Sequence, residues 1–327
     1  MPHLTRRTLL AAAATLATLA ATGVHAQADY PNKSIKFIVP YAAGGLPDTV
    51  ARIVAQRVGD KFGHSVVVDN RPGANGGLAA GVLTSGPADG YQFLVTDGSM
   101  LSINPLIYST LTYNPKKDFV PVALIARAPL FLALNPSKMA PNTLAEWVEY
   151  VKARPGQLNY GSSGIGSTHH LTMESLKHAL GLQITHVPYK GTGQSVPALV
   201  SGQVEMLFSA YPSLAGFVKD GRVKLIATNG AERSALAPNV PAIAEVIPGF
   251  DFAPVVGILA LAGTPPAIIQ KVANAAIEAA KQPDAVAAFK TAGIDVVATG
   301  PEEYAKVIEA ENERFAKAIQ AAGIKRE

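Results

Sequence analysis

Short apolar runs alternate with amphipathic stretches along the first third of the chain. The amphipathic stretch after the first run is predicted to be a helix, because Val50, Ile53, Val54 and Val58 recur at helical spacing. An Ala-rich helix is expected from about residue 78, and strands are expected at residues 35–39, 66–68 and 91–96. Strands that alternate with helices indicate parallel pairing, with helices on both faces of the sheet.

The same alternation restarts in the middle of the chain and continues to its C-terminus. Thr264-Pro265-Pro266 is a strong helix-start signal. The strands expected here cover residues 122–125, 130–134, 157–160, 184–187, 206–208, 225–228 and 256–261, and the helices cover 143–154, 268–281 and 301 to about 323. Because the last of these strands crosses back to the first sheet, two α/β domains are predicted: domain 1, residues 27–125 and 255–327, and domain 2, residues 126–254.

Two glycine-rich loops occupy equivalent places, each between a strand and a helix. They are Pro40-Tyr41-Ala42-Ala43-Gly44-Gly45-Leu46-Pro47 and Gly161-Ser162-Ser163-Gly164-Ile165-Gly166-Ser167-Thr168. The first N–H groups of a helix have no partner inside it, and the helix dipole adds partial positive charge, so anions bind there. Ligands of open sheets lie beyond the carboxyl ends of the strands. The loops therefore predict a small anion held between two domains, with ordinary Gly-rich connections as the alternative interpretation.

Neither loop matches a nucleotide or hydrolase motif. The first has Gly44-Gly45 in place of Gly-x-Gly-x-x-Gly, and no Gly-x-x-x-x-Gly-Lys-Ser/Thr occurs. The second loop lacks the Gly-x-Ser-x-Gly motif of a nucleophile elbow, because Ile165 stands two residues after Ser163, where the motif has its second Gly. No cofactor is therefore predicted, while a dispersed Ser-His-Asp arrangement stays open.

Composition narrows the class of protein further. A chain that is 48% hydrophobic and 16% charged folds as a globular protein. The absence of Cys excludes disulfides and thiolate metal sites. The formal net charge of +4 comes without a clustered Lys/Arg run, so nucleic acid is not an expected partner.

Residues 1–26 have the pattern of an export signal. Arg6 and Arg7 precede an apolar run from Leu9 to Ala21, and small residues stand at the outer cleavage positions Val24 and Ala26. The run is short for a spanning helix, which needs about 20 apolar residues. Cleavage near Ala26 and export to the periplasm are expected, with the paired arginines resembling a twin-arginine signal.

A rival signal for metal binding lies after the second loop. His170, Glu174 and His178 are spaced four residues apart, which places them along one stripe of a helix. The His-Glu-x-x-His arrangement is missing, and only two histidines and one carboxylate are offered. No metal is therefore assigned, but a metal receptor stays among the alternatives.

Several segments together resemble one known family. Residues 41–52, Tyr-Ala-Ala-Gly-Gly-Leu-Pro-Asp-Thr-Val-Ala-Arg, resemble the first-loop motif of the Bug family, the TctC-like substrate-binding proteins of tripartite tricarboxylate transporters. Further matching segments, in family order, are Asp69-Asn70-Arg71-Pro72-Gly73-Ala74, Pro87-Ala88-Asp89-Gly90-Tyr91, Asn104-Pro105-Leu106-Ile107-Tyr108, Asp118-Phe119-Val120-Pro121-Val122, Leu158-Asn159-Tyr160-Gly161-Ser162-Ser163-Gly164, Val187-Pro188-Tyr189-Lys190-Gly191 and Ala262-Gly263-Thr264-Pro265. Their order and spacing make the resemblance specific along nearly the whole mature chain.

The resemblance implies a type II periplasmic-binding-protein-like fold. Each domain would be a mainly parallel sheet flanked by helices, with the ligand cleft between domains and no catalysis. The ligand would be held mostly by main-chain amides and ordered waters. The residues implied to bind it are Tyr41, Ala42, Gly44, Gly45, Leu46, Ser99, Ser162, Gly166, Ser167, Thr168, His169 and Ser209.

Two departures from the family pattern bear on ligand choice. Pro47 stands where the family often has Thr, which removes an amide donor and a hydroxyl. Ser209 stands where many members carry Asp, so a negative side chain facing the cleft is expected to be lost. That loss would disfavour ligands with an amino group.

The sequence thus predicts a monomeric periplasmic solute-binding protein. It would capture a small di-, tri- or aromatic carboxylate between closing domains and deliver it to the membrane permease of a tripartite tricarboxylate-type transporter. The alternative is a secreted metal-binding receptor, or a hydrolase with a dispersed Ser/His site.

Overall fold

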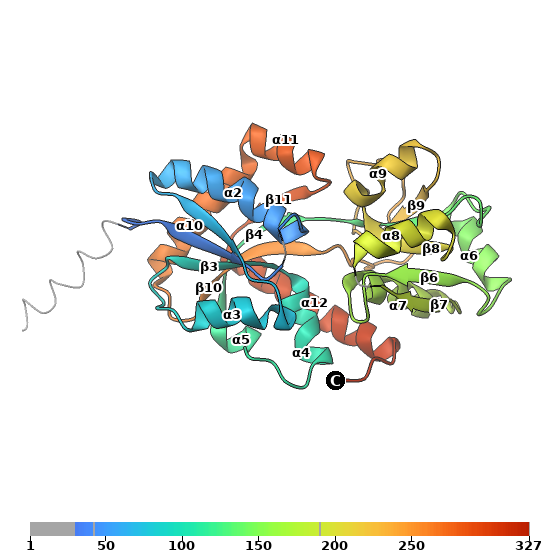
Figure 1. Cartoon of the computed structure of the whole chain (residues 1–327), viewed down its shortest axis with the longest axis horizontal. Helices are drawn as coiled ribbons and strands as arrows, with labels where there is room; N and C mark the ends of the chain where they lie inside the picture. Colours follow the sequence, from blue (N-terminus) through green and yellow to red (C-terminus); the bar gives the residue numbers. More distant parts are fainter. Residues whose placement is uncertain (1–29, 42, 190, 327) are drawn as a thin grey trace, which may run out of the picture.

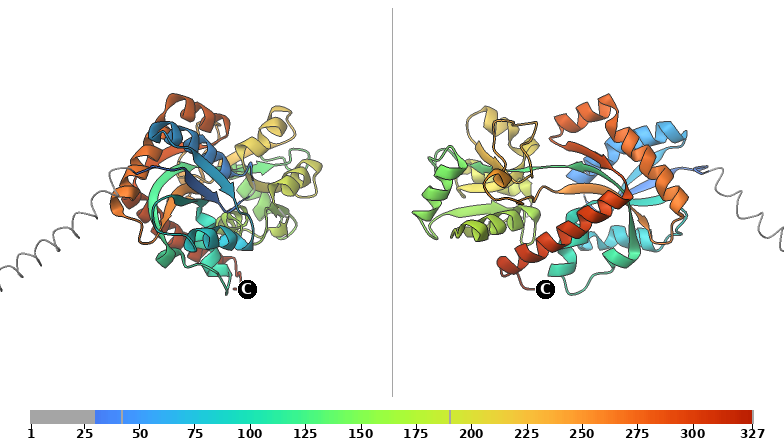
Figure 2. Two further views of the ribbon diagram at one scale, coloured as in Figure 1. Left: turned by 60° about the vertical axis from the view of Figure 1, so that its left-hand side comes forward. Right: turned by 180° about the vertical axis from the view of Figure 1, so that it is seen from behind.

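The computed structural model describes residues 30–41, 43–189 and 191–326. The predicted export signal therefore lies outside the described residues. Figures 1 and 2 show two α/β lobes side by side, each built on its own sheet, which confirms the expected two-domain fold. The proposed boundaries near residues 126 and 255 stay a prediction.

Domain 1 is built on a six-stranded sheet. Its strands, in spatial order, are β11 (Asp295–Thr299), β4 (Phe119–Arg127), β10 (Val255–Leu261), β3 (Gln92–Asp97), β1 (Ile35–Val39) and β2 (Val66–Asn70). Residues of β1 alternate between two apolar cores. Phe37 and Val39 pack with helices α2 (Leu46–Phe62), α10 (Pro266–Lys281) and α11 (Pro283–Thr291), whereas Ile38 packs with α3 (Gly77–Thr84).

Domain 2 is built on a five-stranded sheet. Its order is β7 (Thr185–Pro188), β6 (Asn159–Ser162), β8 (Met206–Ala210), β5 (Leu130–Leu134) and β9 (Lys224–Thr228). Its helices are α6 (Leu144–Lys152), α7 (Thr168–Leu180), α8 (Thr192–Ser201) and α9 (Tyr211–Lys219). Short elements elsewhere are α4 (Asn104–Ile107), α5 (Pro115–Asp118), the π-helical turn η3 (Ser99–Ile103) and the 3₁₀ turns η2 (Ala74–Gly76) and η4 (Ile243–Glu245).

Most strands of each sheet run in one direction, as expected, but both sheets also contain strands of the opposite direction. Strand β1 is parallel to β2 and β3, and β6 is parallel to β7 and β8. In contrast, β10 runs antiparallel to β3 and β4, and β5 runs antiparallel to β8 and β9. The chain passes between domains through β4, β5 and β10, and each strand that returns from the other domain enters its sheet in the opposite direction.

The last helix, α12 (Pro301–Ala321), packs into the cores of both domains. Tyr304 near its start lies in the domain 1 core, while Phe315 and Ile319 near its end lie in the domain 2 core. The right-hand view of Figure 2 shows this helix running from one lobe to the other. One continuous element therefore contributes to both domains.

Glu311 is a buried carboxylate in the middle of α12. It is 1% exposed, its Oε2 atom has no hydrogen-bond partner among the described residues, and a Cβ added at Gly98 would lie 2.5 Å from that atom. Burial raises the pKa of Glu311 to about 8, against an opposing effect of Arg314. The folded protein therefore binds this proton more tightly than the unfolded chain does.

Replacing Glu311 with Gln is expected to stabilise the protein at pH 8 by about 2 kcal/mol or more, because the ionised carboxylate is no longer buried. Since the folded-state pKa is raised, the wild type regains this stability as the pH falls, and the difference closes near pH 4.5. Urea unfolding at both pH values measures the effect. Glu309→Gln, an exposed change on the same helix, should shift stability by less than about 0.5 kcal/mol. If the free energies of unfolding of wild type and Glu311→Gln changed with pH in the same way, the raised pKa of Glu311 would be contradicted.

Candidate ligand-binding cleft

A cavity of 570 Å³ lies between the two domains. The loop before α2 and the residues after β3 line it from domain 1, and the segments that open α7, α8 and α9 line it from domain 2. The carboxyl ends of β1, β3, β6 and β8 thus lead into one space, as expected for open α/β sheets.

Four helices begin at the wall of this cleft. Their N-cap residues are Gly45 for α2, Ser167 for α7, Gly191 for α8 and Ala210 for α9, and all four line the cavity. Only Ser167 caps its helix with its own side chain, by accepting a hydrogen bond from His170 N at 3.3 Å. The first amides of each helix lack intrahelical partners, and each dipole contributes positive potential at this end. The sequence predicted the α2 and α7 sites but missed those of α8 and α9.

The positive potential of the cleft comes from the main chain. Among the described residues that line it, neither Lys nor Arg occurs, and Asp97 is the one acidic side chain. His169 also lines the cleft, but burial lowers its pKa to about 4, so the ring is neutral at pH 7. An anion would therefore be bound by amides and hydroxyls rather than by ion pairs.

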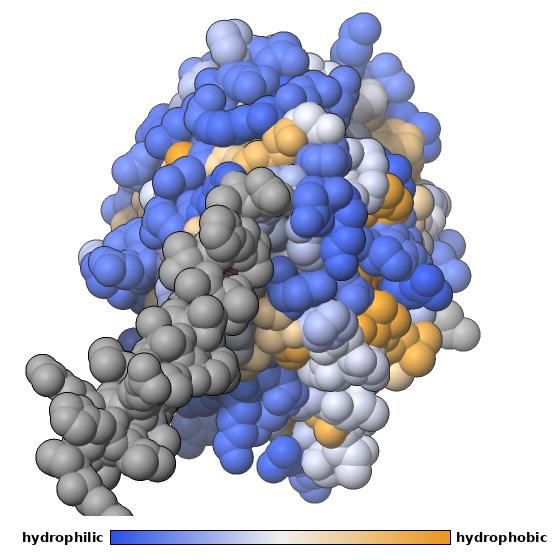
Figure 3. Space-filling view, turned by 90° about the vertical axis from the view of Figure 1, so that its left-hand side faces the viewer, coloured by the Kyte–Doolittle hydropathy of each residue, from blue (hydrophilic) through white to orange (hydrophobic). Residues whose placement is uncertain are grey.

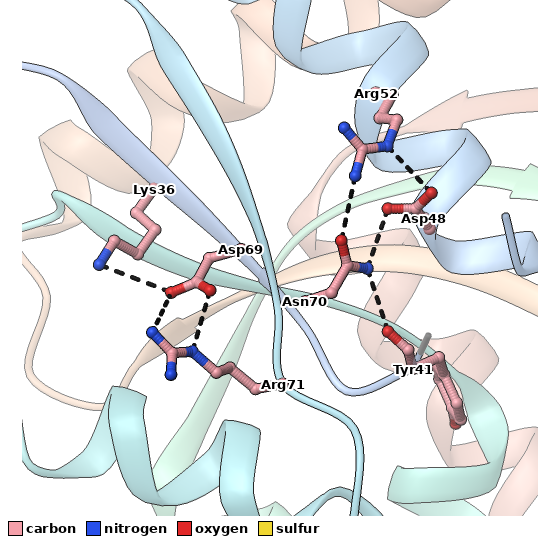
Figure 4. A network of polar contacts seen from close by, with 7 residues as sticks. All are labelled: Lys36, Tyr41, Asp48, Arg52, Asp69, Asn70 and Arg71. Carbon is pink, nitrogen blue, oxygen red and sulfur yellow. Dashed lines mark hydrogen bonds and ion pairs between the residues drawn. The ribbon is translucent and has the colours of Figure 1, made fainter. Parts of the chain in front are cut away.

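A polar network centred on buried Asp48 holds the first loop in place (Figure 4). Asp48 accepts hydrogen bonds from Gly44 N at 2.8 Å, Arg52 Nε at 3.0 Å and Asn70 Nδ2 at 2.9 Å. Asn70 Nδ2 also donates to the Tyr41 carbonyl at 3.0 Å. Burial alone would raise the pKa of Asp48, but the bonds from Arg52, Gly44 and Asn70 lower it below its ordinary value. The loop is thus fixed by charge that does not face the cleft.

Neighbouring Asp69 points away from this network, as alternation along β2 requires. It pairs with Arg71 at 2.9 Å and with Lys36 at 3.6 Å (Figure 4). The Lys36 and Arg71 side chains are about half exposed, so the group contributes little stability.

The second loop is held by its own side chains and main chain. Ser167 Oγ donates to the Gly164 carbonyl at 2.7 Å, and Gly166 N donates to His170 Nδ1 at 3.1 Å. Ser163 Oγ lies 2.7 Å from His169 Nδ1, and both residues line the cleft. These contacts turn the first amides of α7 toward the ligand space.

A stack of aromatic rings lies behind the second loop. The ring centroids of His170 and His186 are 3.9 Å apart with planes 11° from parallel, and Tyr160 stacks on His186 at 4.8 Å. Ser162 Oγ contacts His186 Nε2 at 2.7 Å. Burial lowers the pKa of His170, and burial together with His170 lowers the pKa of His186 to about 4. Burial in the stack therefore favours the neutral form of both rings.

The structure brings most of the predicted site residues together. Those that line the cleft are Tyr41, Gly44, Gly45, Leu46, Ser99, Ser167, Thr168 and His169. Ser162 and Gly166 belong to the second loop but lie behind its surface, and Ala42 lies outside the described residues. Ser209 is fully buried in β8 and does not line the cavity; its neighbour Ala210 does.

Sequence reasoning missed several lining residues of the same cleft. They include Asp97, Thr192, Ala210 and Ser213. Thr192 follows Gly191 at the start of α8. The glycine between the expected strand and this helix is a local signal from which the position of Thr192 could have been predicted. Nothing in the local sequence marks Asp97, because its place depends on how β3 pairs with β1 and β10.

The structure also places the residues behind the metal-receptor and hydrolase hypotheses. Glu174 accepts hydrogen bonds from Tyr160 O–H and Lys177 Nζ, both at 2.5 Å, while His178 is exposed. A group of three or more potential metal ligands does not occur in the part of the chain that the structure describes. The Ser163–His169 pair in the cleft lacks an acidic group on the second ring nitrogen among the described residues.

The fold and cleft define a two-domain solute-binding protein. A model of the tripartite tricarboxylate transporter family receptors, TctC, matches residues 50–324. The chain therefore belongs to this receptor family, which confirms the resemblance to Bug proteins. Among residues 30–326 where described, no helix has the length and apolar character needed to cross a membrane.

Three solved structures illustrate the similarity. Rpa4515 of R. palustris with adipate is 32% identical, with a TM-score of 0.80, over 91% of this chain and all of that chain. MatC of Rhodopseudomonas palustris with bound malate is 30% identical, with a TM-score of 0.73, over 89% and 100%. The periplasmic binding protein BugD is 28% identical, with a TM-score of 0.75, over 91% and 100%.

Acidification should destabilise the protein through the histidine stack. An unfolded His binds its proton near pH 6.5, whereas folded His186 resists protonation until about pH 4, so its contribution is complete above pH 6.5 and is lost as the pH falls toward 4. When the pH falls from 7 to 5, the free energy of unfolding of His186→Asn is expected to decrease by about 1 kcal/mol less than that of wild type, as measured by urea unfolding. The matched control is His178→Asn, an exposed change on α7, whose free energy of unfolding should depend on pH as that of wild type does. Equal slopes for His186→Asn and wild type would show that the stack tolerates protonation.

Proposed function

We propose that this protein is a periplasmic receptor that captures a small carboxylate between its two domains and delivers it to a tripartite tricarboxylate-type permease. The observation that carries the proposal is the meeting of four helix N-termini in a cleft without a cationic side chain among its described lining residues. Such a site favours an anion and supplies the hydrogen-bond donors that a carboxylate accepts.

The ligands of two similar proteins support the chemical class. Adipate and malate both carry carboxylates, and the proteins that hold them share the fold of this chain and are 32% and 30% identical to it. The residues that we assign to the ligand are those of the two loops together with the starts of α8 and α9. The export pattern of residues 1–26 supports a periplasmic location.

Domain closure is the proposed working motion. One helix N-terminus comes from domain 1 and three come from domain 2, so a ligand gains its full set of contacts only when the domains meet. Binding then shifts the population toward the closed form, which the permease would recognise. No catalytic step is part of this function.

The protein is proposed to act as a monomer. Large apolar side chains that are exposed in the described residues lie on separate elements: Val67, Leu78, Ile165, Val246 and Val286. The end of domain 1 seen in Figure 3 is mostly hydrophilic, with apolar residues in small patches. Scattered exposure of this kind does not indicate a permanent interface.

A charge placed at one helix start tests the anion site. Thr192 is the first residue of α8 and lines the cleft, so Thr192→Glu puts a carboxylate where the ligand's would lie while remaining compatible with the helix. Isothermal titration calorimetry with adipate, succinate, malate, citrate and benzoate is expected to show binding of at least one acid to wild type. The Glu variant should lose at least tenfold in affinity for that acid.

Thr192→Gln is the control, because it has nearly the size of Glu without its charge. An affinity loss in the Gln variant equal to that in the Glu variant would assign the effect to bulk rather than to the anion site. Absence of binding by every acid, together with tight binding of a sugar or a metal ion, would overturn the proposed function.

A further inference from the structure

Asp97 places a carboxylate in a cleft that otherwise favours anions. It is the last residue of β3 and lies on the domain 1 side of the cavity. The described residues supply no ion pair to it within 4.0 Å. A negative charge here opposes a carboxylate ligand unless the ligand also carries a group that uses it.

Two hydrogen bonds fix the orientation of this side chain. Asp97 Oδ1 accepts from Tyr41 O–H at 2.6 Å and from Ser99 N at 3.0 Å. The Ser99 side chain also hydrogen-bonds this carboxyl group. Tyr41 and Ser99 N thus hold Oδ1, while the carboxyl group as a whole is only partly buried and lines the cleft.

We propose that Asp97 is a specificity residue that selects carboxylates bearing a hydrogen-bond donor, a hydroxyl or an ammonium, which the Asp97 carboxylate accepts. The inference rests on the proposed function, since it assumes that the ligand's carboxylate lies at the helix N-termini. Domain 2 would then hold the acid group while Asp97 of domain 1 binds the donor.

This assignment reverses an expectation drawn from Ser209. Without an acidic residue at that position, ligands with an amino group were expected to be disfavoured. Ser209 is buried away from the cavity, and the structure supplies an acidic side chain from the opposite domain instead. A donor-free acid would leave the Asp97 carboxylate facing a like charge, which costs affinity.

Matched ligands and one isosteric variant test the inference by calorimetry. The probes are succinate, malate and aspartate on a four-carbon skeleton, adipate and 2-aminoadipate on a six-carbon skeleton, and benzoate and 2-hydroxybenzoate on an aromatic one. In wild type, the donor-bearing acid of any skeleton that binds should bind at least tenfold more tightly than its donor-free partner.

Asp97→Asn should reverse this order for the amino-bearing acids and remove the preference for the hydroxy acids, because its amide keeps an acceptor for Tyr41 and Ser99 but presents N–H donors, which a hydroxyl can accept and an ammonium group cannot. The control Asp60→Asn removes the same charge at an exposed position on α2 and should keep the wild-type order. Tyr41→Phe, which frees Oδ1, should reduce the discrimination without reversing it. If Asp97→Asn does not fold, the ratios of wild-type affinity for donor-bearing and donor-free acids, together with the effect of Tyr41→Phe on them, still test the role of Asp97.

Two negative outcomes are distinguishable. If acids bind wild type with equal affinity whether or not they carry a donor, or if Asp97→Asn weakens all of them alike, the role of Asp97 is wrong and the proposed function stands. If none of the acids on any skeleton binds and a sugar or a metal ion binds tightly instead, the proposed function fails and this inference fails with it.

Discussion

Unpaired main-chain amides at helix starts are the constraint on which the site depends. Four helices begin at one cleft, and each leaves N–H groups that its own backbone cannot satisfy. Under the proposed function, closure around an anion would exclude water and strengthen the interaction of the anion with these groups. This arrangement provides positive potential without the side-chain entropy that ordering Lys or Arg would cost.

Such a site requires rigid loops, and polar groups that help to fix the two loops do not line the cleft. The network of Asp48, Asn70 and Arg52 holds the first loop from the side of α2. The stacked rings of His170 and His186 support the second loop from behind. Because these groups act on the backbone, they set the geometry of the amides while leaving ligand choice to the few side chains that reach the cavity.

The sequence was sufficient for the repeated strand, loop and helix units, because their hydrophobic spacing and glycines are local signals. Seven of the predicted site residues in these loops line the cleft, and their contact with a ligand stays a prediction: Tyr41, Gly44, Gly45, Leu46, Ser167, Thr168 and His169. Asp97 and the start of α9 could not be predicted, because only strand pairing brings them to the same edge. The direction of β10 and β5 was also missed, since hydrophobic spacing does not distinguish a parallel from an antiparallel neighbour.

The segment that presents Asp97 is packed against the helix that joins the domains. Gly98, the next residue, lies so close to Glu311 of α12 that a Cβ there would meet both carboxylate oxygens within 2.8 Å. The same helix reaches the domain 2 core through Phe315 and Ile319. If the proposed closure displaces α12, close packing would pass that displacement to the backbone beside Asp97. One helix thus contacts both the segment that carries Asp97 and the core of domain 2.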